Sequence, residues 1–339
     1  MIVRLALLAL SIALANTVAS AQSAPPGPRV VLKVGAIGAV SDAGIFIAQD
    51  KGFFRDEGLD VELVGFKAAP QILPAIATGE VEVSGSAVTP ALFNAFARGI
   101  GLKLVADKGQ VAKGFGFAAI AIRSDFADTV KDFKDLKGRK FAVMGKGVSS
   151  TAQLGKALEL GGIEPNEVEL VELGLPEMVA ALGNKAIDGA TLLEPFITLA
   201  TARRVAVRWK GMEDFLPFTG QNGVIIYSQK FAEEQADAAK RWMVAYLKGN
   251  RAYLDAVTKG TDRDEINAIL ARHTAVKDLS LLARIAPTGF DPNGRLEARS
   301  LEADQDWFRK LGLQQGRADL GQVIDYRYVD HAVAQLGKR

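Results

Sequence analysis

Four short stretches of the sequence carry side chains of the kind that contact a small ligand. They are 38–44 with Ser41 and Asp42, 84–87 with Ser86 and Ala87, 144–151 with Lys146, Ser149, Ser150 and Thr151, and 194–196 with Glu194 and Phe196. Hydroxyls and glycine N–H groups at the start of a helix can hold an anionic group, because the first N–H groups of a helix have no partner within it. We therefore expect a ligand-binding site built from these stretches.

The charge of that ligand stays open on the sequence alone. Lys108 and Lys146 favour an anion, whereas Asp42 and Glu194 favour an amine or amide. No arginine falls in the four stretches, which disfavours an anion gripped by a bidentate guanidinium. Each stretch is also consistent with an ordinary capped turn, and Phe196 is equally consistent with a core position.

The sequence lacks most of the residue patterns that are typical of a catalytic site. The chain has no cysteine and two histidines, His273 and His331, so a thiolate nucleophile, a cysteine metal site and a histidine-centred triad are excluded or unsupported. The run 145–150 follows a strand like a dinucleotide fingerprint, but Ser150 stands where the last glycine belongs, and no P-loop is present. We expect no catalytic residue, metal or cofactor. A carboxylate-based enzyme remains an alternative through Asp42, Asp107, Asp188 and Glu194.

Charge and length narrow the class of protein further. The formal net charge of +2 gives no basic stripe for a nucleic-acid backbone, so no nucleic-acid partner is expected. The 339 residues suggest two domains.

The N-terminus predicts export. Residues 1–21 combine Arg4, an apolar run at 5–14 and the small-x-small site Ala19-Ser20-Ala21, which is typical of a cleaved signal peptide. The apolar run is too short for a membrane anchor. Residues 22–29 are predicted to be a flexible leader, and the periplasm is the expected location.

The elements that position the four stretches alternate between strand and helix. We expect strands at 30–36, 60–64, 81–84 and 102–105 with helices at 43–57, 70–78 and 89–98, then strands at 140–144, 168–171, 188–193 and 204–208 with helices at 151–160, 176–184 and 195–203. This rhythm indicates mostly parallel α/β sheets. Further helices are expected at 233–258, 262–273 and 296–311.

Two extended runs, 115–122 and 222–227, separate the two α/β sets. They predict a discontinuous first lobe, 30–118 and 222–339, and a second lobe, 119–221. Two connections between lobes make a hinge, and a cleft between lobes is a common place for a ligand.

Several segments together resemble substrate-binding proteins of the nitrate/sulfonate/taurine class, which share the NMT1/THI5-like fold. They are GIFIAQDKGFF at 44–54, EGL at 57–59, VE at 61–62, DLKG at 135–138, GGI at 161–163, VELV at 168–171, AAL at 180–182, IDGA at 187–190 and EPF at 194–196. The resemblance spans about residues 30–230. The opening turn departs from the family pattern, with Ala43-Gly44-Ile45 where many relatives have an aromatic residue or proline.

The resemblance implies the type II periplasmic-binding-protein fold and capture of a small polar or anionic organic solute. It also implies delivery of that solute to an ABC-type permease, and we expect a monomer. The ligand contacts that it implies are Ser41, Asp42, Ser86, Ala87, Ser149 to Thr151 and Glu194. The pyrimidine-making enzymes of the family use a cysteine cluster and a histidine, which this chain lacks before position 273. A sensing subunit on the same fold is the remaining alternative.

Overall fold

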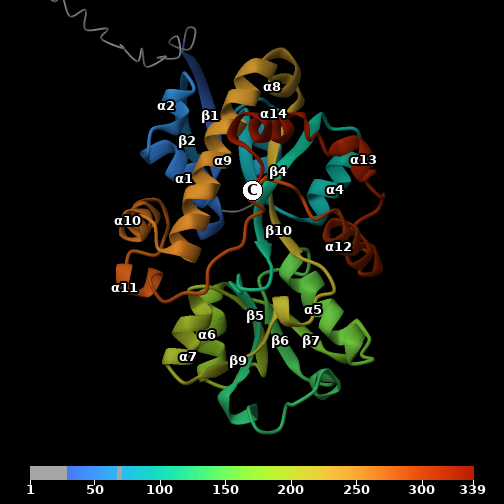
Figure 1. Cartoon of the computed structure of the whole chain (residues 1–339). Helices are drawn as coiled ribbons and strands as arrows, with labels where there is room; N and C mark the ends of the chain where they lie inside the picture. The colour runs from blue at the N-terminus through green and yellow to red at the C-terminus, as the bar shows by residue number, and fades with distance from the viewer. Residues whose placement is uncertain (1–28, 67–70) are drawn as a thin grey trace, which may run out of the picture.

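The computed structural model describes residues 29–66 and 71–339. The predicted signal peptide, and the leader up to residue 28, lie outside this range. The described chain forms two lobes, each built on a five-stranded sheet with helices around it (Figure 1). The expected α/β architecture of two lobes is confirmed.

The first sheet has the strand order β2-β1-β3-β10-β4. Its strands are β1 (Val30–Ala36), β2 (Leu59–Gly65), β3 (Val83–Ala87), β4 (Leu102–Val111) and β10 (Gly220–Ser228). Strand β1 pairs in parallel with β2 and β3, whereas β10 runs antiparallel to β3 and β4.

The second sheet repeats this plan with the order β7-β6-β8-β5-β9. Its strands are β5 (Ala118–Arg123), β6 (Lys140–Val143), β7 (Glu169–Glu172), β8 (Gly189–Leu193) and β9 (Ala206–Gly211). Strand β6 is parallel to β7 and β8, and β5 is antiparallel to β8 and β9. The antiparallel strand of each sheet is the first strand that the chain forms after it leaves the other sheet. It is β10 in the first sheet and β5 in the second. The two connections therefore run between β4 and β5 and between β9 and β10.

Helices surround both sheets. Those of the α/β units are α1 (Ala43–Asp50), α2 (Phe53–Asp56), α3 (Ile72–Ala77), α4 (Pro90–Ala97), α5 (Ser149–Leu160), α6 (Leu175–Gly183) and α7 (Phe196–Ala202). The single helix expected over 43–57 is wrong. Gly52 takes a left-handed conformation with φ of 80°, which separates α1 from α2.

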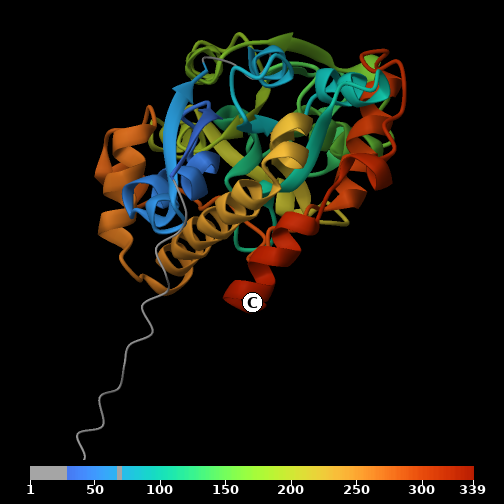
Figure 2. The ribbon, with the colours of Figure 1, turned by 90° about the horizontal axis from the view of Figure 1, so that it is seen from above.

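The C-terminal third is helical, as expected, but more finely divided. It contains α8 (Gln229–Glu234), α9 (Ala236–Lys259), α10 (Arg263–His273), α11 (Leu279–Leu282), α12 (Ala298–Lys310), α13 (Leu320–Val323) and α14 (Arg327–Leu336). The long helix α9 packs against α1 and α14, and Figure 2 shows α14 beside it.

Helix α12 joins the first lobe but also reaches the second. Phe308 of α12 packs on Phe93 of α4, with ring centroids 6.3 Å apart, inside the apolar core of the first lobe. On its other side α12 contacts α5 of the second lobe (Figure 1). Helix α12 thus lies at the boundary between the lobes.

Two features are absent from residues 29–66 and 71–339. No helix in this range is long and apolar enough to cross a membrane. No group of three or more His, Cys, Asp or Glu in it is arranged to hold a metal ion.

Candidate ligand-binding site

Asp42 is the centre of the first predicted stretch. Its side chain is 0% exposed, and its Oδ2 accepts hydrogen bonds from the backbone N–H groups of Ile37 and Ala39, both at 3.1 Å. These bonds close the turn between β1 and α1. The second oxygen, Oδ1, lies 2.8 Å from Nζ of Lys108.

Lys108 lies in the middle of β4, yet its side chain is only 1% exposed. Its Nζ also donates to Oγ of Ser41 at 3.0 Å. Gly85 on β3 leaves the room for this pair, because a Cβ there would lie 2.3 Å from Cε of Lys108 and 2.9 Å from Oδ1 of Asp42. A buried charge is tolerated when it is paired and hydrogen-bonded, so this ion pair is a preformed part of the first lobe.

The second stretch is not the turn that the sequence predicted. Residues 84–87 continue β3, where Ser86 pairs with Val224 and Ala87 with Gly223 of the antiparallel strand β10. The strand is longer because its partner enters the sheet from a remote part of the chain. Ser86 is buried, and its Oγ donates to the carbonyl of Ala87 at 3.1 Å.

The third stretch forms the loop that leads into α5. Thr151 donates to the carbonyl of Gly145 at 2.7 Å, and Ser149 donates to the carbonyl of Val88 in the first lobe at 3.5 Å. Ser150 is buried, and within the described structure its Oγ has no hydrogen-bond partner. Lys146 is exposed and contributes only its backbone N–H, which donates to Glu172 at 2.9 Å.

The fourth stretch contacts a loop of the first lobe at Ala286, three residues before Gly289. Glu194 accepts from the N–H and hydroxyl of Thr198, both at 3.0 Å, and thereby caps α7. Its Oε1 also accepts from the N–H of Ala286 at 3.3 Å. Phe196 is half-buried and packs against the core of the second lobe.

Two of the four stretches contact the other lobe, and the other two lie within the first lobe. Ser41 and Asp42 are joined to β3 and β4 through Lys108, and Ser149 reaches the residue that follows β3. Glu194 reaches the segment 286–289, whose Gly289 bonds to Gln110 on β4. Contacts of the third and fourth stretches thus cross from the second lobe to the first, and Ser41, Asp42 and Lys108 are joined within the first lobe.

The sequence did not reveal several residues that hold the four stretches in place. Lys108 was noted only for its charge, because a lysine inside a strand usually faces solvent. Gln153 donates to Asn222 on β10 at 3.0 Å and so ties α5 to the first lobe. The backbone carbonyl of His273 lies 3.4 Å from the place of a Cβ on Gly38, which brings α10 beside the first stretch. A partner so distant in sequence leaves no local signal.

Four carboxylates raised the possibility of acid–base catalysis, but each is held by different donors. Asp42 pairs with Lys108, and Glu194 caps α7. Asp188 accepts from Arg123 and from the N–H of Lys140. Asp107 accepts from the N–H groups of Gly109 and Asp291 and from Gln221, and burial raises its pKa to about 7. These contacts do not place any two of the four side by side as an acid–base pair.

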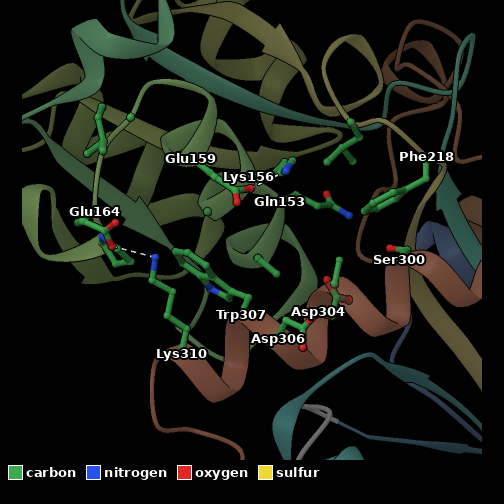
Figure 3. A pocket seen from close by; sticks show the side chains of 17 residues that line it. Gln153, Lys156, Glu159, Glu164, Phe218, Ser300, Asp304, Asp306, Trp307 and Lys310 are labelled. Atoms are coloured by element: carbon green, nitrogen blue, oxygen red, sulfur yellow. Dashed lines mark hydrogen bonds and ion pairs between the residues drawn. The ribbon is translucent and has the colours of Figure 1, made fainter.

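A pocket of about 420 Å³ lies between α5 and α12. Gln153, Asp304 and Trp307 are among its lining residues, and none of the ten residues predicted as ligand contacts lines it (Figure 3). The predicted solute contacts and this pocket therefore comprise different residues.

Known proteins resemble this chain in sequence and in fold. A protein-family model described as NMT1/THI5 like matches residues 40–256. A putative aliphatic sulfonates-binding protein of Bacillus subtilis (strain 168) is 27% identical over 211 residues, which are 60% of this chain and 60% of that protein. The chain thus matches less than two thirds of that relative's length.

Solved structures share the fold at low identity. The periplasmic aliphatic sulphonate binding protein SsuA from Escherichia coli superposes with a TM-score of 0.71 and 21% identity, over 87% of this chain and 92% of that one. The desulfurization enzyme DSZB superposes with a TM-score of 0.65 and 15% identity, over 91% and 100%. Since the family model covers more than half of the sequence, this chain belongs to the NMT1/THI5-like family.

Proposed function

We propose that the protein is a periplasmic solute-binding protein that captures a small anionic or polar organic solute for an ABC-type importer. One observation carries the proposal. Ser41 and Asp42 of the first predicted stretch contact a buried ammonium, Lys108, and the third and fourth stretches contact the first lobe from the second lobe. The names of the relatives make aliphatic sulfonates the first class of solute to test.

The two-lobed plan supplies a mechanism for capture. The chain passes from the first sheet to the second between β4 and β5 and returns between β9 and β10. These two connections link the lobes as a hinge. A solute that contacts Ser41 in one lobe and Ser149 in the other binds both only when the lobes are together. Such a solute shifts the equilibrium toward the closed form, because only that form makes both sets of contacts.

Export and docking complete the proposal. A cleaved leader at 1–21 would deliver a monomer to the periplasm, where the closed form would meet a permease in the inner membrane. Neither a nucleic acid nor a cofactor has a role in this scheme.

A calorimetric titration tests solute capture. The panel contains propane-1-sulfonate, butyrate and propylamine, which share a short chain and differ in head group. We expect saturable binding of the sulfonate or the carboxylate and compaction on small-angle scattering. Binding of propylamine alone would contradict an anionic solute, and no binding across a broad panel would contradict capture.

Matched serine variants locate the site. Ser41→Ala removes a hydroxyl that touches Lys108, and Ser280→Ala removes an exposed hydroxyl on α11. We expect Ser41→Ala to weaken binding by about tenfold, the loss of one hydrogen bond to a charged group, and Ser280→Ala to have no effect. Equal behaviour of the two variants would place the solute elsewhere.

An enzyme on this fold is the competing function, since DSZB shares the architecture. The separate partners of the four carboxylates give it no support here. Recovery of the bound solute unchanged after long incubation would favour capture, and a chemically altered solute would favour the enzyme.

A further inference from the structure

The pocket between α5 and α12 joins the two lobes at their boundary. Its walls come from α5 and the following loop in the second lobe, from α12 in the first, and from Leu216 and Phe218 in the connection toward β10. We call it the α5–α12 pocket. Anything bound there touches both lobes and one of the two connections between them.

The middle of the pocket is apolar and closely fitted. Trp307 of α12 lies flat against α5 at Gly155, where a Cβ would be 2.4 Å from the indole ring. Ala152, Ile163 and Phe218 add further apolar lining. A volume of about 420 Å³ suits a molecule with one ring or a short chain.

One end of the pocket holds buried acceptors that lack donors. Figure 3 shows Gln153, Asp304, Ser300 and Phe218 gathered at that end, with Glu164 and Lys310 at the other. Gln153 and Asp304 are each 3% exposed. Within the described residues, Oε1 of Gln153 and Oδ2 of Asp304 have no hydrogen-bond partner. Burying an acceptor without a donor is costly, so both oxygens call for a donor group that the protein does not supply.

The charged side chains around the pocket form ion pairs with one another or with nearby residues, except for one carboxyl group. Lys310 pairs with Glu164 at 2.8 Å, Lys156 with Glu159, and Asp306 with Arg317. In the part of the chain that the structure describes, Asp304 forms no ion pair, and the hydroxyl of Ser149, shared with the carbonyl of Val88, is the one neighbouring group that lowers its pKa. The pairing therefore leaves one unmatched acidic group, Asp304, beside one further unmatched acceptor, Oε1 of Gln153.

We propose that the α5–α12 pocket is a second binding site, which adjoins the proposed solute site at Ser149, for a small organic amine or amidine with an apolar or aromatic body. The cationic N–H groups donate to Asp304 and Gln153, and the body packs on Trp307. Burial raises the pKa of Asp304 well above its ordinary value, and a bound cation offsets that cost of ionisation. Because the pocket bridges the lobes, its ligand stabilises their contact.

Benzylamine is the probe, with benzyl alcohol and benzoate as neutral and anionic controls of the same shape. We expect saturable calorimetric binding of benzylamine, with both controls at least tenfold weaker. Asp304→Asn should weaken benzylamine binding by about tenfold or more, the effect of one charge-assisted contact. The matched variant Asp306→Asn changes a second carboxylate of the pocket lining, which is exposed and already pairs with Arg317, and should change binding less than twofold.

The indole N–H signals locate the probe without relying on a variant. Of the three tryptophans, Trp242 is buried in the first lobe and Trp209 donates to the carbonyl of Val130, so only the Trp307 signal should shift with benzylamine. An unmoved Trp307 signal at saturation, equal binding of benzyl alcohol, or equal losses in the two aspartate variants would overturn the proposal. Sulfonate binding is measured separately, so failure of the solute site and failure of this pocket are distinguishable.

Discussion

Two buried carboxyl groups of the first lobe have opposite surroundings. Asp42 contacts Lys108 and two backbone N–H groups, whereas Asp304 has one hydroxyl partner and an oxygen with none in the described structure. The first carboxylate is therefore neutralised before any ligand arrives. The second carboxyl group, Asp304, can still accept a hydrogen bond from a bound ligand. Burial therefore does not by itself identify a group that binds a ligand. A buried group without hydrogen-bond partners in the protein is the better candidate.

Removing the ammonium from the Asp42 pair should have the largest effect on stability. Lys108→Met leaves a fully buried carboxylate without its cation, which should lower the free energy of unfolding by about 3–5 kcal/mol. Chemical denaturation measures the change. The double variant Asp42→Asn with Lys108→Met removes both charges and should recover most of the loss. A single-variant loss below about 1 kcal/mol would mean that water already reaches the pair.

A third buried carboxyl, Asp107, allows a test by pH. Burial raises its folded-state pKa to about 7, against about 4 in the unfolded chain. Its stabilising contribution is thus complete below about pH 4 and is lost as the pH rises to about 7, by about 1 kcal/mol per unit. We expect Asp107→Asn to remove this part of the fall in unfolding free energy, whereas Asp306→Asn keeps it. Identical pH profiles for both variants would show that the hydrogen bonds to Asp107 outweigh its burial.

Gly85 tests how tightly the Asp42 pair is packed. A Cβ at this position would overlap Lys108, whose buried side chain has little room to move. Gly85→Ala should lower the free energy of unfolding by about 1–3 kcal/mol, the usual cost of overpacking. Gly65→Ala is the matched control, because it lies on β2 with no atom within 4 Å of its new methyl group. Equal effects of the two would mean that the ion pair is loosely held.

The sequence predicted the alternation of strands and helices because that pattern is local. It missed features that depend on distant partners. Residues 84–87 were expected to turn, but β10 extends the strand through them. Lys108 was recognised as a charge, yet its place in the site depends on Ser41 and Asp42, more than sixty residues away. The α5–α12 pocket lies between two helices that are far apart in the sequence, and no local pattern in either helix predicts that they pack together.

The smallest expected effect distinguishes the two carboxyl groups most directly. Asp304→Asn removes a group whose ionisation burial opposes, and it keeps an oxygen that can accept from Ser149. At about pH 8 the free energy of unfolding should stay level or rise by up to about 1 kcal/mol, because folding no longer requires the burial or protonation of that carboxylate. Asp42→Asn should change stability in the other direction, since it leaves Lys108 buried without its counter-charge. If chemical denaturation showed Asp304→Asn to be as destabilising as Asp42→Asn, Asp304 would have a cationic partner within the fold, and the α5–α12 pocket would lose the unmatched charge on which its ligand depends.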